Sequence, residues 1–255
     1  MDGNLRVLRG GDGDPLLLLL HGLGATADVW AGWQPMLADR WPGRWLAPDL
    51  PGHGGSAPLP NYTFEGLAAA VRPLVEPGLV EPGMVEPGGR TVVLGHSLGG
   101  VVGLALAAAG APVAAVVGLG IKVAWTNEEL DKAQALARRP VTWFASRDEA
   151  AERYLRVSGL ARLLGAGHPA VAAGLVQEDG RWRLALDPGA FGVGAPDMAG
   201  LVARSPAAVT LARGELDPMN SDEQLGQWGV PVVTLPGLGH NAHVESPEQC
   251  LTLLT

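Results

Sequence analysis

Short apolar runs that do not alternate with polar residues recur along the chain, and stretches with a helical pattern separate them. A strand covered on both faces needs such a continuous run. The runs predict buried strands over 16–20, 45–48, 91–95, 113–118, 207–212 and 230–235, with a weaker edge strand over 5–8. Helices are predicted over 27–40, 63–75, 98–109, 128–138, 149–157, 222–228 and 247–254, with Thr26 and Ser246 as helix caps. This alternation predicts an α/β fold with a mostly parallel, doubly wound sheet.

One connection in this pattern is much longer than a strand–helix–strand link requires. The 86 residues of 121–206 hold several predicted helices and no predicted core strand. We therefore predict a core domain formed by 1–120 and 207–255, with 121–206 as an inserted, mainly helical domain. A Val-Glu-Pro-Gly repeat at 75–78, 80–83 and 85–88 is predicted to form a solvated loop.

Composition narrows the class of protein. Hydrophobic residues make up 47% of the chain and charged residues 17%, which fits a globular protein. The longest aliphatic run has five residues, 16–20, so no membrane span is expected. The formal charge of −8 argues against nucleic-acid binding, and the single Cys250 excludes an internal disulfide framework or a cysteine-based metal cluster. The first residues lack a signal-peptide pattern, so we expect a soluble, cytoplasmic protein.

The sequence Gly95-His96-Ser97-Leu98-Gly99-Gly100 carries the strongest chemical signal. It follows a predicted strand and opens a predicted helix, which is the setting that a nucleophile elbow requires. Glycines flank the serine where a side chain would clash. We therefore predict Ser97 as a nucleophile at the helix N-terminus, with a capping serine in a βα turn as the alternative.

A second glycine-rich segment, His21-Gly22-Leu23-Gly24, follows the strand predicted over 16–20. The backbone N–H of Leu23 can pair with that of Leu98 as an oxyanion hole, which donates to charge that develops on an attacked carbonyl. Gly24 is the alternative donor. We interpret His21 as a structural turn residue.

A nucleophilic serine needs a base, and the base needs an orienting carboxylate. Asp217 follows the strand predicted over 207–212 and is the preferred carboxylate, with Glu215 as its competitor. His240 lies in a glycine-rich loop beyond the last predicted strand and is the preferred base, with His243 as its competitor. The order Ser97, Asp217, His240 is that of α/β-hydrolases.

Four motifs resemble the α/β-hydrolase superfamily over nearly the whole chain. In chain order they are 21–24, Asp49-Leu50-Pro51-Gly52-His53-Gly54-Gly55-Ser56, the elbow and 237–240. The resemblance implies the α/β-hydrolase fold, no metal or cofactor, and a cap domain at 121–206. It gives 49–56 a structural role near the site, so we assign His53 no catalytic role. It implies a serine esterase or related acyl hydrolase that acts on a small molecule.

The insertion holds six of the 13 aromatic residues, which form either its core or an apolar substrate pocket. The pocket candidates are Trp125, Trp143, Phe144 and Trp182. Between residues 138 and 162 there are six arginines against three acidic residues. This run is either a solvated helix face or a patch for an anionic substrate or an acidic acyl carrier protein.

The motifs do not separate ester hydrolysis from other reactions of the same superfamily. Carbon–carbon bond hydrolases, acyltransferases and lyase-like synthases share the elbow, so they stand as alternatives. A non-catalytic ligand-binding protein on the same fold is the alternative from another class, although Ser97, Asp217 and His240 argue against it.

Overall fold

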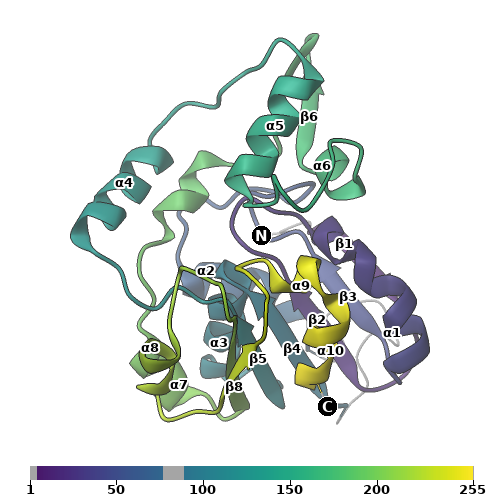
Figure 1. Cartoon of the computed structure of the whole chain (residues 1–255), viewed down its shortest axis with the longest axis vertical. Helices are drawn as coiled ribbons and strands as arrows, with labels where there is room; N and C mark the ends of the chain where they lie inside the picture. The colour runs from purple at the N-terminus through teal and green to yellow at the C-terminus, as the bar shows by residue number, and fades with distance from the viewer. Residues whose placement is uncertain (1–4, 77–88, 255) are drawn as a thin grey trace.

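The computed structural model describes residues 5–76 and 89–254, and within them seven strands form one sheet (Figure 1). The strand order is β1-β3-β2-β4-β5-β8-β9, with β1 antiparallel to β3 and every other pair parallel. The strands are β1 (Val7–Gly10), β2 (Leu16–Leu20), β3 (Trp45–Pro48), β4 (Thr91–His96), β5 (Ala115–Leu119), β8 (Ala208–Gly214) and β9 (Val232–Leu235). The predicted, mostly parallel α/β sheet is confirmed. Apart from Val75 and Glu76, the Val-Glu-Pro-Gly repeats lie outside the described residues.

Helices cover both faces of this sheet (Figure 1). One face carries α2 (Phe64–Val71) with η2 (Arg72–Leu74), α3 (Leu98–Ala108), α7 (Met198–Arg204) and α8 (Asp222–Gly226). The other face carries η1 (Ala27–Trp33), α1 (Gln34–Arg40), α9 (Ala242–Glu245), α10 (Pro247–Leu251) and η4 (Thr252–Leu254). No helix in the described part of the chain combines the length and apolar character that crossing a membrane requires.

Strand β2 shows why the buried runs lack polar alternation. Leu16, Leu18 and Leu20 pack into the core on the α3 side, whereas Leu17 and Leu19 pack into the core on the α1 side. All five side chains are buried. Successive side chains of a strand point to opposite faces, so a strand between two helical layers needs apolar residues at every position.

Two local expectations differ from the structure. The helix predicted over 27–40 is divided into the 3₁₀ helix η1 and α1, because Pro35 in the first turn of α1 has no N–H for a continuous helix. The Thr26 side chain makes no capping hydrogen bond; the Asp49 carboxylate accepts from the Ala27 N–H instead, at 2.7 Å. The Ser246 hydroxyl does accept from the Gln249 N–H, as expected for a cap.

The insertion lies beyond the end of the sheet where β4 and β5 finish (Figure 1). It contains α4 (Asn127–Ala137), α5 (Arg147–Val157), α6 (Pro169–Ala173), β6 (Leu175–Glu178), β7 (Arg181–Leu184) and η3 (Pro188–Val193). The β6–β7 hairpin was not predicted, although Asp179-Gly180 at its turn is a sequence signal for one. The segment ends with α7, whose Met198 and Leu201 pack into the core beside α3. The predicted boundaries of an inserted domain stay a prediction.

The helices of the insertion are attached to the rest of the molecule in different ways. Helix α4 has no buried side chain, and a capping box between Thr126 and Glu129 fixes its start. Helix α5 buries four side chains, among them Tyr154 and Leu155, in the core on the α1 side of the sheet. Helix α5 therefore shares a core with the sheet, while α4 packs on η3 within the insertion.

Candidate active site

Ser97 occupies a strained turn between β4 and α3. Its φ of 50° and ψ of −114° lie outside the regions that non-glycine residues ordinarily adopt. A side chain at Gly95 would collide with the Gly99 carbonyl oxygen, and one at Gly99 would collide with the Leu20 carbonyl oxygen. The chain can make this sharp turn because both positions are glycine. The geometry matches the predicted elbow, in which the serine side chain stands above the end of the sheet.

Asp217 and His240 meet at the same end of the sheet, on the loops after β8 and β9. The Asp217 Oδ2 lies 3.0 Å from the His240 Nδ1, and the Asp217 Oδ1 accepts from the Met219 N–H at 2.8 Å. The Asp217 side chain is fully buried, whereas that of His240 is 21% exposed. Glu215 instead accepts from the Gly237 N–H. The hydrogen bond favours Asp217 over Glu215 as the carboxylate that orients the histidine.

His240 is held beside the elbow through the residue that precedes the serine. The His96 Nε2 donates to the His240 carbonyl oxygen at 2.9 Å, and the two ring centroids are 4.8 Å apart. Within the described residues, the Ser97 hydroxyl makes no hydrogen bond. Of the three predicted residues, Asp217 and His240 are therefore joined by a direct hydrogen bond, and Ser97 is not. Such bonds to a nucleophile often form only when a substrate is bound.

The two amides predicted to form an oxyanion hole lie beside Ser97. Leu23 and Leu98 line the same cavity as the serine. In the part of the chain that the structure describes, neither N–H donates a hydrogen bond to another group. The Leu98 N–H is also at the first turn of α3, where amides have no partner within the helix. Both amides therefore remain available to an oxygen of a bound molecule.

Four buried histidines surround this arrangement. His21 is fixed by the Leu50 N–H, which donates to its Nε2 at 2.8 Å. His243 is packed between Trp30 and His96, with ring centroids at 4.7 and 4.1 Å, and it contacts no carboxylate. Burial lowers the pKa of His53 and of His243 to about 3, and also lowers the pKa of His21 and His96. These rings are neutral packing elements, which favours His240 over His243 as a base.

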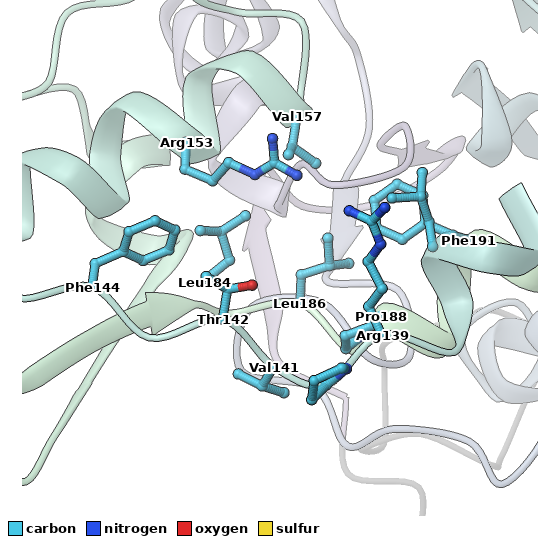
Figure 2. A pocket seen from close by; sticks show the side chains of 12 residues that line it. Arg139, Val141, Thr142, Phe144, Arg153, Val157, Leu184, Leu186, Pro188 and Phe191 are labelled. Carbon is cyan, nitrogen blue, oxygen red and sulfur yellow. The ribbon is translucent and has the colours of Figure 1, made fainter. Parts of the chain in front are cut away.

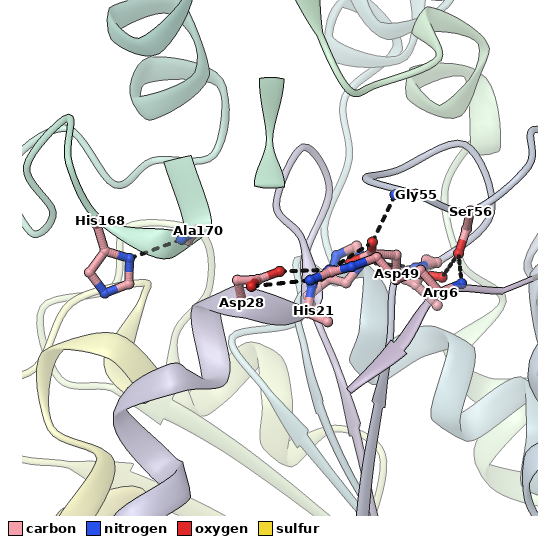
Figure 3. A network of polar contacts seen from close by, with 10 residues as sticks. Arg6, His21, Asp28, Asp49, Gly55, Ser56, His168 and Ala170 are labelled. Atoms are coloured by element: carbon pink, nitrogen blue, oxygen red, sulfur yellow. Dashed lines mark hydrogen bonds and ion pairs between the residues drawn. The ribbon is translucent and has the colours of Figure 1, made fainter. Parts of the chain in front are cut away.

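The Asp49 carboxylate connects the oxyanion segment to the loop of residues 49–56 (Figure 3). It accepts from the Ala27 N–H at 2.7 Å, the Gly55 N–H at 2.9 Å and the Arg6 guanidinium at 3.1 Å. Arg6 also pairs with Asp28 at 2.7 Å. Asp49 is completely buried and its bond from the Ala27 N–H is made away from water, whereas its contacts with Gly55 and Arg6 are partly exposed. The carboxylate fixes the backbone four residues after Leu23.

A cavity of about 350 Å³, which we call the Ser97 cavity, opens above the serine. Its wall is mainly apolar and comes from the core and from α4 and η3, including Phe64, Val101, Leu130, Leu136 and Phe191. Such cavities take a ligand with an apolar body and orient it with a few polar groups.

The predicted pocket aromatics are placed differently from one another. Trp125 lines the Ser97 cavity, and Phe144 lines a second cavity in the insertion. The backbones of Phe144 and Trp182 pair with each other, and Trp143 is stacked by Arg181, whose guanidinium lies 4.8 Å from the ring centroid. Trp143 and Trp182 line neither of these two cavities: Trp143 is covered by Arg181, and Trp182 is paired with Phe144 through its backbone.

Sequence reasoning missed a charged group in the Ser97 cavity. Lys122 lines it and pairs with Glu129 at 2.9 Å, while its ammonium lies 5.2 Å from the Trp125 ring centroid. Lys122 and Lys132 are the two lysines of the sequence, against 16 arginines, and both line this cavity. The position of Lys122 shortly after a predicted strand is the signal that could have drawn attention to it.

Comparison with known proteins identifies the family. The sequence pattern of the alpha/beta hydrolase family matches residues 17–253, so the chain belongs to that family. Over 105 residues the chain is 39% identical to the magnesium-chelatase 30 kDa subunit of Rhodobacter capsulatus, covering 41% of this chain and 34% of that protein. Over 57 residues it is 42% identical to the pimeloyl-[acyl-carrier protein] methyl ester esterase of Methylococcus capsulatus, covering 22% of each. These matches span about a third or less of the relatives' own lengths.

Solved structures share the fold over nearly the whole chain. An E-2-(acetamidomethylene)succinate hydrolase superposes with a TM-score of 0.78 at 24% identity, covering 98% of this chain and 93% of the other. A thioesterase domain from the curacin biosynthetic pathway superposes with a TM-score of 0.76 at 19% identity, covering 100% and 99%. At these identities the likeness establishes the fold alone, and the predicted α/β-hydrolase fold is confirmed.

The Asp49 contacts lead to a stability prediction. Asp49→Asn should lower the free energy of unfolding by about 3 kcal/mol, because a buried charge-assisted network loses its acceptor. The matched control is Asp28→Asn, which should cost about 1 kcal/mol or less since Asp28 is nearer the surface and contacts Arg6 alone through its side chain. Urea denaturation of both variants measures the difference. Equal losses would show that Asp49 is not the centre of the network.

The buried histidines lead to a pH prediction. A histidine whose pKa is lowered on folding binds fewer protons folded than unfolded, so stability is complete above about pH 6.5 and falls as the pH drops towards 3. Each such group should remove up to ~1.4 kcal/mol per pH unit in this window. Urea midpoints at pH 7.5, 6 and 5 test this. His53→Gln should make the dependence shallower and His168→Gln should not; a flat wild-type profile would contradict the prediction.

Proposed function

We propose that this chain is a serine hydrolase that cleaves an ester or a related acyl bond. The observation that carries the proposal is the Asp217–His240 hydrogen bond, which lies at the same end of the sheet as the strained Ser97 elbow. Membership of the alpha/beta hydrolase family supports hydrolase activity. An esterase among the relatives and a thioesterase domain among the structural neighbours favour acyl-bond chemistry.

The reaction follows from the positions of these groups. The Ser97 Oγ attacks the substrate carbonyl carbon, and its proton passes to the His240 Nε2. Asp217 accepts from the His240 Nδ1–H, which keeps Nε2 free to act as a base and stabilises the imidazolium. The carbonyl oxygen becomes negatively charged and accepts from the Leu23 and Leu98 N–H groups.

Collapse of this intermediate breaks the bond between the carbonyl carbon and the leaving group. His240 gives its proton to the departing alcohol or thiol, and Ser97 is left acylated. A water molecule then loses a proton to His240 and attacks the acyl-enzyme, which releases the acid and restores the serine. The chemistry uses only groups of the chain and water.

The Ser97 cavity suggests the form of the substrate. Its apolar wall fits an acyl part that is mainly hydrocarbon, and α4 and η3 supply much of that wall. We propose that residues 121–206 act as a cap that selects the substrate. Trp125 and Lys122 line the Ser97 cavity, and we propose them as cap residues that contact the substrate.

Ser97→Ala tests the nucleophile. Turnover of a short activated ester should fall by about 10⁴–10⁶-fold, because nucleophile and base act as a unit. The circular dichroism spectrum and the urea midpoint should stay close to those of the wild type, and labelling by a fluorophosphonate should disappear. A variant that keeps a tenth of wild-type activity would refute this mechanism.

The identities of the base and its carboxylate need a second test. His240→Ala should resemble Ser97→Ala, and Asp217→Asn should lower kcat by about 10⁴-fold because asparagine favours the wrong imidazole tautomer. Glu215→Gln serves as the matched control and should keep activity within about tenfold, since its contact is to the backbone of residue 237. Steady-state kinetics of the three variants give the comparison. A larger loss for Glu215→Gln than for Asp217→Asn would reassign the acid.

A further inference from the structure

The insertion encloses a second, smaller cavity of about 90 Å³, which we call the arginine cavity (Figure 2). It lies between the segment after α4, helix α5 and the region that follows β7. Leu136 and Phe191 line both this cavity and the Ser97 cavity. The two spaces are therefore neighbours, separated by a wall of two apolar side chains.

The arginine cavity also lies near the segment that carries Leu23. Val157 lines it, and a Cβ at Gly24 would lie only 2.7 Å from the Val157 Cγ1. Leu23, the adjacent residue, lines the Ser97 cavity. Residues 23–24 therefore lie close to lining residues of both cavities, and the side chains common to the two cavities are Leu136 and Phe191.

Two arginines give this cavity its chemical character. Arg139 and Arg153 come from different elements, and Figure 2 shows their guanidinium groups turned towards each other above Leu184 and Leu186. The hydroxyl of Thr142 points into the same space. None of the residues that line the cavity is acidic.

Three other arginines of the same stretch have partners, whereas Arg162, which does not line the cavity, has none among the described residues. Arg156 pairs with Glu152 at 3.6 Å, Arg138 donates to the Gln134 carbonyl oxygen, and Arg147 donates to that of Ala166. In the described part of the chain, the side chains of Arg139 and Arg153 have neither an ion pair nor a hydrogen bond. Both residues are exposed to solvent, so an anion can reach them, and two guanidinium groups that face the same space attract it together.

We propose that the arginine cavity is an anion subsite for the substrate of Ser97. It binds a carboxylate or a phosphate carried by the part of the ester that extends past Leu136 and Phe191, while the apolar part occupies the Ser97 cavity. Guanidinium forks match both anions with paired hydrogen bonds. The inference rests on the proposed hydrolase activity and adds the substrate class: an ester with one apolar and one anionic end.

Matched esters test the subsite by kinetics. One pair compares the monomethyl ester of a dicarboxylic acid with the methyl ester of the monocarboxylic acid of equal length, which places the anion on the acyl part. The other pair esterifies one acyl group to glycolate and to ethanol, which places the anion on the alcohol part. Arg139→Gln/Arg153→Gln should raise KM about tenfold or more for the anionic member of at least one pair. It should leave kcat/KM of the neutral members within twofold.

Arg156→Gln is the control, because it removes a positive charge from a nearby exposed position that does not line the cavity. It should change KM less than twofold, and added salt should raise the wild-type KM for the anionic ester only. The pair that responds tells whether the anion lies on the acyl or on the alcohol part. Equal changes for anionic and neutral esters, or an equal effect of Arg156→Gln, would overturn the subsite.

A binding measurement separates this inference from the proposed chemistry. Calorimetric titration of a dicarboxylic acid and of inorganic phosphate into Ser97→Ala should show binding of at least one of them. That binding should weaken about tenfold or more when Arg139→Gln/Arg153→Gln is added. Unchanged binding, or none, would overturn the subsite even if neutral esters are cleaved. Failure of neutral-ester turnover and of Ser97 labelling would instead refute the hydrolase proposal, whatever the titration shows.

Discussion

The buried Asp49 carboxylate is the interaction on which the arrangement of the site depends. Through one side chain it fixes the start of η1, the turn at Gly55 and the side chain of Arg6. The segment that carries Leu23 runs between two fixed points, because the His21 ring is held by the Leu50 N–H on one side and the Ala27 N–H is held by Asp49 on the other. A backbone donor can stabilise developing charge only if it does not have to move to do so. The loop of residues 49–56 provides this rigidity without reaching the reacting atoms.

The serine itself depends on the close approach of the backbones of β4, α3 and β2. Gly95 and Gly99 allow β4 and α3 to meet at an angle that strains Ser97, and the strain is held by the packed sheet around it. Buried histidines fill the space behind: His96 bonds to the His240 carbonyl, and His243 packs on His96. The loop that carries His240 is thus supported both by neutral aromatic packing and by the carboxylates of Glu215 and Glu245, which accept from the Gly237 and Gly239 N–H groups, while Asp217 contacts the His240 ring itself.

Most of the core and the positions of Ser97, Asp217 and His240 at strand ends could be predicted from sequence. Continuous apolar runs such as Leu16–Leu20 mark strands between two layers, and glycines mark the turns. Predictions from the sequence were less successful where contacts between residues far apart in the chain determine the local structure. Asp49 caps η1 in place of Thr26, and Trp143 is stacked by Arg181 rather than exposed to a cavity. The sequence did indicate the arginine run 138–162, but which of its members line a cavity depends on how the insertion folds, and the same holds for Lys122 in the Ser97 cavity.

The unequal attachment of α4 and α5 has a consequence for how a ligand enters. Helix α5 cannot leave the sheet without exposing Tyr154 and its buried neighbours to water, so its detachment approaches the cost of disrupting the core. Helix α4 has no buried side chain, and its ties are the Lys122–Glu129 pair and the bond from Gln134 to the Gly192 carbonyl. Local opening above the serine therefore costs less free energy at α4, which packs on η3, than at α5, which is part of the core.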